Sequence, residues 1–123
     1  MAIKRHALDI YGTELYLATN RRDWATLRRR LDFLDKTPDA AGRSCFATFV
    51  PNDGSVTQSH LALWIDAAAH RSDFELIETA AHEASHGTAQ IFEWIDHEIK
   101  GSDEPSAYLV GWLTRWIVEG VRS

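Results

Sequence analysis

Two histidines and a glutamate lie within five residues of this 123-residue chain, in the pattern H-E-x-x-H: His82, Glu83 and His86. Residues four apart lie one turn above one another on a helix, so both imidazoles can reach a single ion. Glu83 lies beside that face, where a carboxylate can polarise a water at the ion. The motif therefore predicts a zinc site. The alternative is a surface helix with two solvated histidines.

The residues around the motif predict a helix. Ser72 and Glu75 have the spacing of a capping box, with Ser72 as the N-cap. Apolar residues then recur at three- and four-residue steps, as in a helix with one buried face. These residues are Phe74, Ile77, Ala81, Ala84, Thr88, Ile91, Phe92 and Ile95. The motif falls in the middle of this helix, with Ala84 facing the core and both histidines at the margin of the apolar stripe.

A catalytic zinc site needs a third protein ligand and one open position. Glu93 lies about 10 Å from His86 along a continuous helix, which is too far to share the ion. His97 would serve only if the helix broke just after the motif. Glu104 follows a turn at 100–103 and opens a second amphipathic helix, whose first turn suits Pro105. We therefore predict Glu104 as the third ligand.

The second helix has its own apolar stripe, in which Gly111 would allow close helix–helix approach. The stripe consists of Ala107, Tyr108, Val110, Gly111, Thr114, Ile117 and Val118. Tyr108, one turn beyond Glu104, is a candidate donor to a developing oxyanion or to a ligand carboxylate. Buried packing of the tyrosine is the alternative. Trp112 and Trp116 suit packing or an interface.

The runs 82–87 and 103–113 together resemble a known group. H-E-x-x-H followed by a glutamate at the start of a second helix looks like the gluzincin pattern of zinc metallopeptidases. The same runs resemble small zincin-like proteins of tailed phages and prophages. The resemblance covers about the last 50 residues. Tyr108 stands where thermolysin-like enzymes have an aspartate that orients the first histidine.

The resemblance implies peptide-bond hydrolysis by a zinc-activated water, with Glu83 as general base. In zincins the strand before the motif helix binds substrate backbone, which implies this role for residues 60–66; alternation around a core explains that strand equally well. His60, His70 and His97 are further candidate transition-state donors, or ordinary exposed histidines. The rival function is a zinc-stabilised phage structural or host-interaction protein with little or no catalysis.

Composition indicates one domain over residues 1–123, because 45% hydrophobic residues suffice for a single core. A net charge of −5 argues against a nucleic-acid partner, and no apolar run has the length of a membrane span. No signal-peptide pattern opens the chain, which predicts a cytoplasmic protein, in the bacterial host if phage-encoded. The lone Cys45 excludes an internal disulfide and suits a buried strand position.

The order of elements predicts an α+β protein with a minimal zincin-like fold. A small, mostly antiparallel sheet would pack on the motif helix and its partner, in the order β-α-β-β-α-α. Residues 1–10 remain unassigned. The predicted elements before the motif helix are strands at 14–19, 44–50 and 59–66, a helix capped by Asn20, a loop at 37–42 and a turn at 51–54. The arginines of the Asn20-capped helix alternate with aspartates, which favours a solvated face over a nucleic-acid site.

Overall fold

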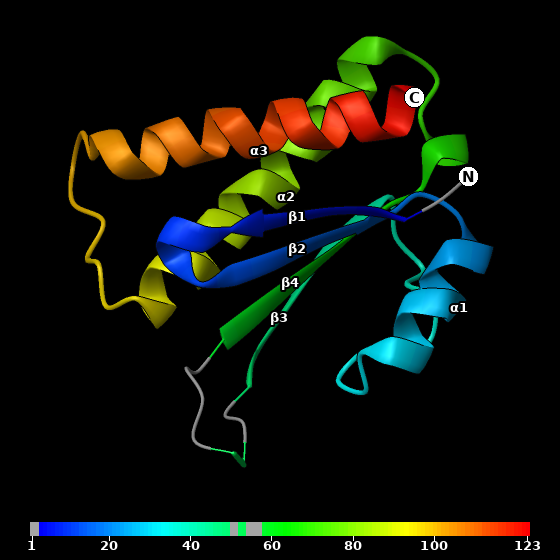
Figure 1. Cartoon of the computed structure of the whole chain (residues 1–123). Coiled ribbons are helices and arrows are strands. Elements are labelled where there is room, and N and C mark those ends of the chain that lie inside the picture. Colours follow the sequence, from blue (N-terminus) through cyan, green and yellow to red (C-terminus); the bar gives the residue numbers. More distant parts are fainter. Residues whose placement is uncertain (1–2, 50–51, 54–57) are drawn as a thin grey trace.

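The computed structural model describes residues 3–49, 52–53 and 58–123 of the chain and has the predicted α+β architecture (Figure 1). Within the described residues, four strands form one sheet and three α-helices pack on it. The strands are β1 (Lys4–Leu8), β2 (Thr13–Ala18), β3 (Gly42–Phe49) and β4 (Gln58–Ile65). The helices are α1 (Arg21–Arg30), α2 (Asp73–Trp94) and α3 (Glu104–Arg122), and short 3-10 turns lie at Asp9–Tyr11 and Ala67–Ala69.

The sheet is mixed, with strand order β1-β2-β4-β3. Its two outer pairings are antiparallel, but the central strands β2 and β4 are parallel, with Leu15 opposite Leu61. The predicted order lacked β1, because the middle of this edge strand is exposed and shows no alternation of apolar and polar residues. The parallel pairing joins distant segments, and no local pattern encodes it.

Alternation along the central strands gives the sheet two apolar faces. Leu15, Leu61 and Leu63 point into one core with α2 and α3. Tyr16, Ala62 and Trp64 point the other way, into a second core with Trp24 and Leu27 of α1. The sheet therefore lies between a layer of two helices and the single helix α1 (Figure 1).

Helix α1 begins as predicted at Asn20, whose side chain accepts a hydrogen bond from the Asp23 N–H at 2.9 Å. Its apolar side is buried, with Trp24 and Leu27 almost fully excluded from solvent. Its five arginines are all exposed. The helix thus presents a solvated basic face, in agreement with the sequence-based interpretation.

Helix α2 also begins at the predicted cap. The Ser72 hydroxyl accepts from the Glu75 N–H at 3.2 Å, and the Glu75 carboxylate accepts from the Arg71 N–H at 2.9 Å. The predicted apolar stripe is wrong in the first two turns, where Phe74 is 85% exposed and Ile77 47% exposed. Leu76 and Ala80 are buried there instead.

Helix α3 is capped by Asp103, which accepts from the Ser106 N–H, and Pro105 lies in its first turn as expected. Its predicted apolar stripe was correct at Ile117, which is buried, and wrong at Ala107, Tyr108 and Gly111, which are exposed. Leu109, Leu113, Trp116 and Ile117 face the core, and these residues also recur at three- and four-residue steps, so the sequence contained two competing stripes.

Gly111 does not allow close helix–helix approach. It is exposed, and a Cβ added there would meet no atom within 4 Å. Close approaches of helix to sheet lie instead at Gly87 of α2, where a Cβ would lie 2.8 Å from the Leu61 side chain of β4, and at Gly120 of α3, where a Cβ would collide with the Leu17 side chain of β2.

The remaining predicted features are local. Cys45 lies half-buried in β3, where burial raises the pKa of its thiol. Of the predicted turn at 51–54, the structure describes residues 52 and 53, and both have turn conformation. Across the described ranges, no helix has the length and apolar character needed to cross a membrane.

Candidate metal centre

The two motif histidines lie together on the solvent side of α2. Their Nε2 atoms are 3.2 Å apart, and both side chains are exposed. Two nitrogens bound to one tetrahedral zinc at about 2.0–2.1 Å would be about 3.3–3.4 Å apart. The pair therefore has the spacing of a shared zinc ion. The same distance suits a hydrogen bond between two neutral imidazoles, in which one Nε2 donates to the other.

The histidines border a hollow between α2 and the edge strand β3. The hollow has a volume of about 430 Å³. Its lining residues are Gly42, Arg43 and Ser44 of β3 with His82, Glu83, His86 and Gln90 of α2. One helix and one strand thus supply every residue at this site.

Glu83 is buried beneath the histidines, at 6% exposure. The Ser44 hydroxyl lies 3.0 Å from the Glu83 Oε1 and 2.9 Å from the Glu83 backbone oxygen, to either of which it can donate. A buried carboxylate is costly unless it accepts hydrogen bonds, so Ser44 both stabilises the carboxylate and fixes its direction. Among the described residues, Oε2 accepts no hydrogen bond, and it lies against Gly42 of β3.

Gly42 provides the space for this arrangement. A Cβ at Gly42 would lie 2.8 Å from the Glu83 Cγ and 2.8 Å from the Thr79 Cγ2. The absence of a side chain on this residue of β3 therefore lets the Glu83 side chain pass directly over the strand.

The structure does not bring Glu104 to the histidines. Helix α3 lies over β1 and β2, where Lys4 donates to the Trp116 backbone oxygen at 3.0 Å and the His6 ring contacts Trp112. Helix α2 lies between α3 and the hollow. Glu104 is the first residue of α3, and its side chain is exposed. In the described part of the chain, no three side chains of His, Cys, Asp or Glu gather to hold an ion.

Tyr108 and His60 also lie away from the hollow. Tyr108 is 77% exposed on α3. His60 points to the α1 side of the sheet, where its Nδ1 is 3.0 Å from the Tyr16 hydroxyl. Burial lowers the pKa of His60, while burial raises that of Tyr16. Neither of the two proposed donors faces the motif in this arrangement.

The other two histidines predicted as candidate donors, His70 and His97, have structural partners. His70 contacts the Asp66 backbone oxygen and the Thr79 hydroxyl, each at 2.8 Å, and so fixes the segment before α2. His97 lies 2.9 Å from the Asp103 carboxylate and packs on the Phe92 ring. The hydrogen bond from His97 is the main cause of the lowered pKa of Asp103.

Strand β4 cannot take a substrate strand, contrary to the expectation for residues 60–66. It pairs with β2 on one side and with β3 on the other. Strand β3 is at the edge of the sheet, and no described strand pairs with its outer side. The expectation came from the resemblance to zincins, and the sequence gave no sign of the parallel β2–β4 pair that makes β4 a central strand.

Four residues of the hollow were not predicted from the sequence: Gly42, Arg43, Ser44 and Gln90. Gly42 and Ser44 are two apart on one strand and so share a face, but nothing in the sequence links that face to α2. Gln90 is four residues beyond His86. Helical spacing therefore predicts that it lies on the same face, one turn further along α2. Its Oε1 is buried and has no hydrogen-bond partner among the described residues.

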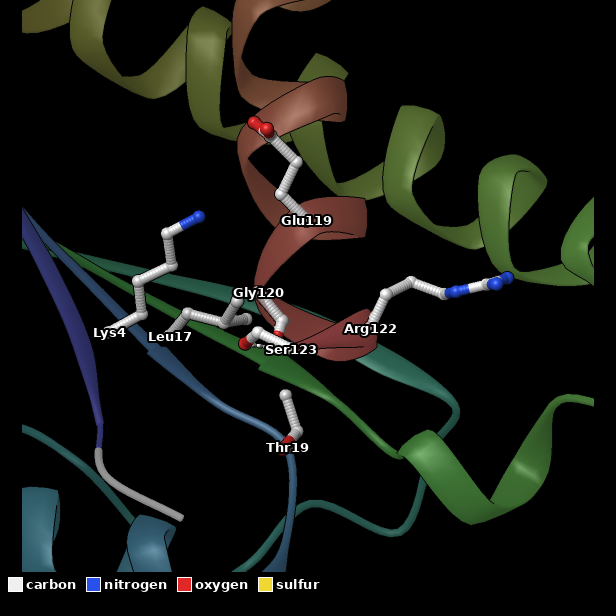
Figure 2. A pocket seen from close by; sticks show the side chains of 7 residues that line it. All are labelled: Lys4, Leu17, Thr19, Glu119, Gly120, Arg122 and Ser123. Carbon is white, nitrogen blue, oxygen red and sulfur yellow. Dashed lines mark hydrogen bonds between the residues drawn. The ribbon is translucent and has the colours of Figure 1, made fainter.

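A second hollow of about 630 Å³ lies at the other edge of the sheet, between β1, β2 and the end of α3 (Figure 2). Its charged groups are already engaged. Lys4 donates to the backbone of α3, Glu119 pairs with Arg115, and Arg122 pairs with Asp73. Glu119 and Arg122 point away from one another in Figure 2. This hollow therefore has no convergent set of groups for chemistry.

Comparisons of the chain with protein-family models, with curated proteins and with solved structures gave no match.

Proposed function

We propose that the chain is a zinc-dependent hydrolase of peptide bonds with a minimal zincin-like fold. The observation that supports this best is the His82–His86 pair, with its Nε2 atoms 3.2 Å apart, beside a buried glutamate and an open hollow. A zinc ion on these nitrogens would polarise a substrate carbonyl and lower the pKa of an attacking water. The resemblance of the motif to gluzincins is in accord with this function.

Glu83 is the general base in this proposal. Ser44 hydrogen-bonds to Oε1, so Oε2 is free to take the proton of the attacking water and then deliver it to the leaving amine. The Ser44 hydroxyl of β3 orients the Glu83 carboxylate, so the orientation of this base does not depend on substrate binding. Positioned proton transfer of this kind typically contributes about 10²–10⁴ in rate.

The edge strand β3 supports a peptide as the substrate. Residues 42–44 line the hollow, and the outer backbone edge of the strand is unpaired among the described residues. An extended peptide can add to such an edge by main-chain hydrogen bonds. Its scissile carbonyl would then lie beside His82 and His86.

The second candidate is a zinc-stabilised structural or host-interaction protein of a phage, acting in the host cytoplasm. The observation that favours it is the position of Glu104, which is the third ligand in gluzincins and lies away from the two histidines here. For Glu104 to act as a ligand, the connection at 95–103 would have to rearrange when metal binds.

Glu83→Gln separates the two candidates. A hydrolase should keep its zinc and its thermal unfolding midpoint in this variant, while cleavage of unfolded casein falls at least about 100-fold. His82→Ala should lose both zinc and activity. Equal cleavage by wild type and Glu83→Gln would reject Glu83 as the base. Zinc binding without cleavage of any peptide in a broad library would favour the structural protein.

A further inference from the structure

We propose that the outer face of helix α1 binds a short acidic segment of another protein. This arginine face consists of Arg21, Arg22, Arg28 and Arg29, which surround the small Ala25 and are all exposed. Helix α1 packs on the side of the sheet opposite to α2, so the arginine face lies apart from the histidine motif (Figure 1). The site goes beyond the proposed hydrolase function and does not depend on zinc.

Helical spacing puts the four arginines on one side of α1. Arg21 and Arg28 are seven residues apart, as are Arg22 and Arg29. Each pair therefore lies along nearly the same line of the helix, with about 10 Å between its members. Ala25 lies between the two pairs, and its short side chain leaves the surface among the guanidiniums accessible. The buried residues of α1 point the opposite way, into the second core.

The arginine face has no counter-charge within the protein. None of its guanidiniums forms an ion pair with a described carboxylate. Asp23 is the one acidic residue of α1, and its side chain is buried, where it accepts a hydrogen bond from the Asn20 side chain at 3.0 Å. Arg21 and Arg22 also lie in the first turn, where the helix dipole disfavours positive charge. A bound anion would offset this cost.

A hollow of about 340 Å³ in the C-terminal half of this face gives an anion a defined place. Its lining residues are Trp24, Ala25, Arg28 and Arg29 of α1 with Thr37 of the following loop. Both guanidiniums and the Thr37 hydroxyl can donate hydrogen bonds, and none of the described lining residues is acidic. One N–H of Arg29 donates to the Thr26 hydroxyl at 3.2 Å, which orients its guanidinium. A carboxylate fits these donors, because a guanidinium binds it through paired hydrogen bonds.

The charge around the arginine face favours a protein segment over a nucleic acid. The chain has a net charge of −5. Asp32, Asp35 and Asp39 follow α1 along the chain and are exposed. A phosphate backbone that extended beyond the helix would be repelled by these carboxylates. A segment as long as α1, about 15 Å, would contact the arginines alone.

A second copy of the chain does not offer a matching acidic surface on α2, which has more acidic residues than the other two helices. Asp73 pairs with Arg122, and Glu83 is buried beneath the histidines. Glu78 and Glu93 are fifteen residues apart, about 22 Å along the helix, which exceeds the length of the arginine face. The partner is therefore a different protein.

Binding of a fluorescent glutamate hexapeptide to the full chain tests the inference, measured by anisotropy at low salt with a glutamine hexapeptide as the neutral control. Arg28→Gln combined with Arg29→Gln should weaken binding of the glutamate peptide at least about tenfold. Lys100→Gln combined with Arg115→Gln removes the same charge from exposed positions elsewhere and should change binding less than about twofold. Ala25→Glu should also weaken binding at least about tenfold, because its carboxylate would occupy the space among the arginines.

All of these positions are exposed, so each variant should keep the thermal unfolding midpoint of the wild type; if the double arginine variant unfolds, Ala25→Glu decides. His82→Ala should bind the peptide as wild type does, which separates this site from the zinc site. Equal losses in the two double variants would overturn the inference, because net charge alone would then explain the attraction. Absence of binding by the wild-type chain would overturn it too, as would tighter binding of a thymidine hexanucleotide than of the peptide.

Discussion

The two sides of helix α2 differ in what they bury. Toward α3 and the sheet, α2 packs Ala84 and Ile91 into one core with Leu109 and Leu113. Toward β3, the same helix buries a carboxylate, an unsatisfied amide oxygen and a contact with a glycine. The side of α2 that faces α3 and the sheet is apolar, and its burial stabilises the fold.

The second side has features that cost stability. A buried carboxylate and an unpaired amide oxygen are unfavourable, and such groups concentrate where a protein binds or reacts. The difference indicates that α2 is anchored by its apolar side so that its β3 side is free to carry chemistry. Three experiments, each with its own control variant, test this division in order of decreasing effect.

Leu113→Ala should have the largest effect, a loss of about 2–5 kcal/mol in the free energy of unfolding. Leu113 is fully buried in the core under α2, and the shorter side chain leaves a cavity. Urea denaturation measures the loss. Ile99→Ala, at a 44%-exposed position between α2 and α3, is the control and should change stability by less than about 0.5 kcal/mol. A similar loss in both variants would mean that the apolar side does not anchor the helix.

Gly42→Ala and Gly111→Ala should have opposite signs. At Gly42 the new Cβ would meet Glu83 and Thr79 at 2.8 Å, and such overpacking costs about 1–3 kcal/mol. At Gly111 the new methyl group meets no atom within 4 Å, and alanine stabilises an exposed helix position by about 0.5–1 kcal/mol relative to glycine. Thermal unfolding of both variants gives the comparison. Stabilisation by both substitutions would show that Glu83 does not pass over β3 as described.

Ser44→Ala should cost about 1–2 kcal/mol, because the Glu83 carboxylate loses a hydrogen bond in a buried position. The same substitution in a Glu83→Gln background is the control. If Ser44 acts through the carboxylate, the two changes should couple by about 0.5 kcal/mol or more in a double-mutant cycle. Strict additivity would assign the Ser44 effect to its contact with the backbone oxygen alone.

The sequence predicted what depends on neighbouring residues. The caps at Asn20 and Ser72 were correct, because each is formed by residues three apart in the chain. The juxtaposition of His82 and His86 was correct for the same reason, since helical geometry alone sets it. These features need no knowledge of the rest of the fold.

Features that depend on distant segments were not predictable. The phases of the α2 and α3 stripes failed at Phe74 and Tyr108, because several apolar residues competed and only the packed structure chose among them. Glu104 begins a helix, as predicted. The side of α2 on which this helix packs depends on distant residues, and the sequence around Glu104 does not indicate it. The contact of Ser44 with Glu83 spans 39 residues and has no local signal.

The parallel pair β2–β4 also determines the order in which the chain can fold. Thr13 is opposite Ser59, so the centre of the sheet closes a loop of about 45 residues that includes α1 and β3. Such a long-range pairing forms slowly. Because α2 and α3 follow the last strand, a ribosome releases the whole sheet before the helices that cover Leu15, Leu61 and Leu63. The nascent chain therefore passes through a stage with an uncovered apolar face, the stage at which aggregation or a chaperone would compete with folding.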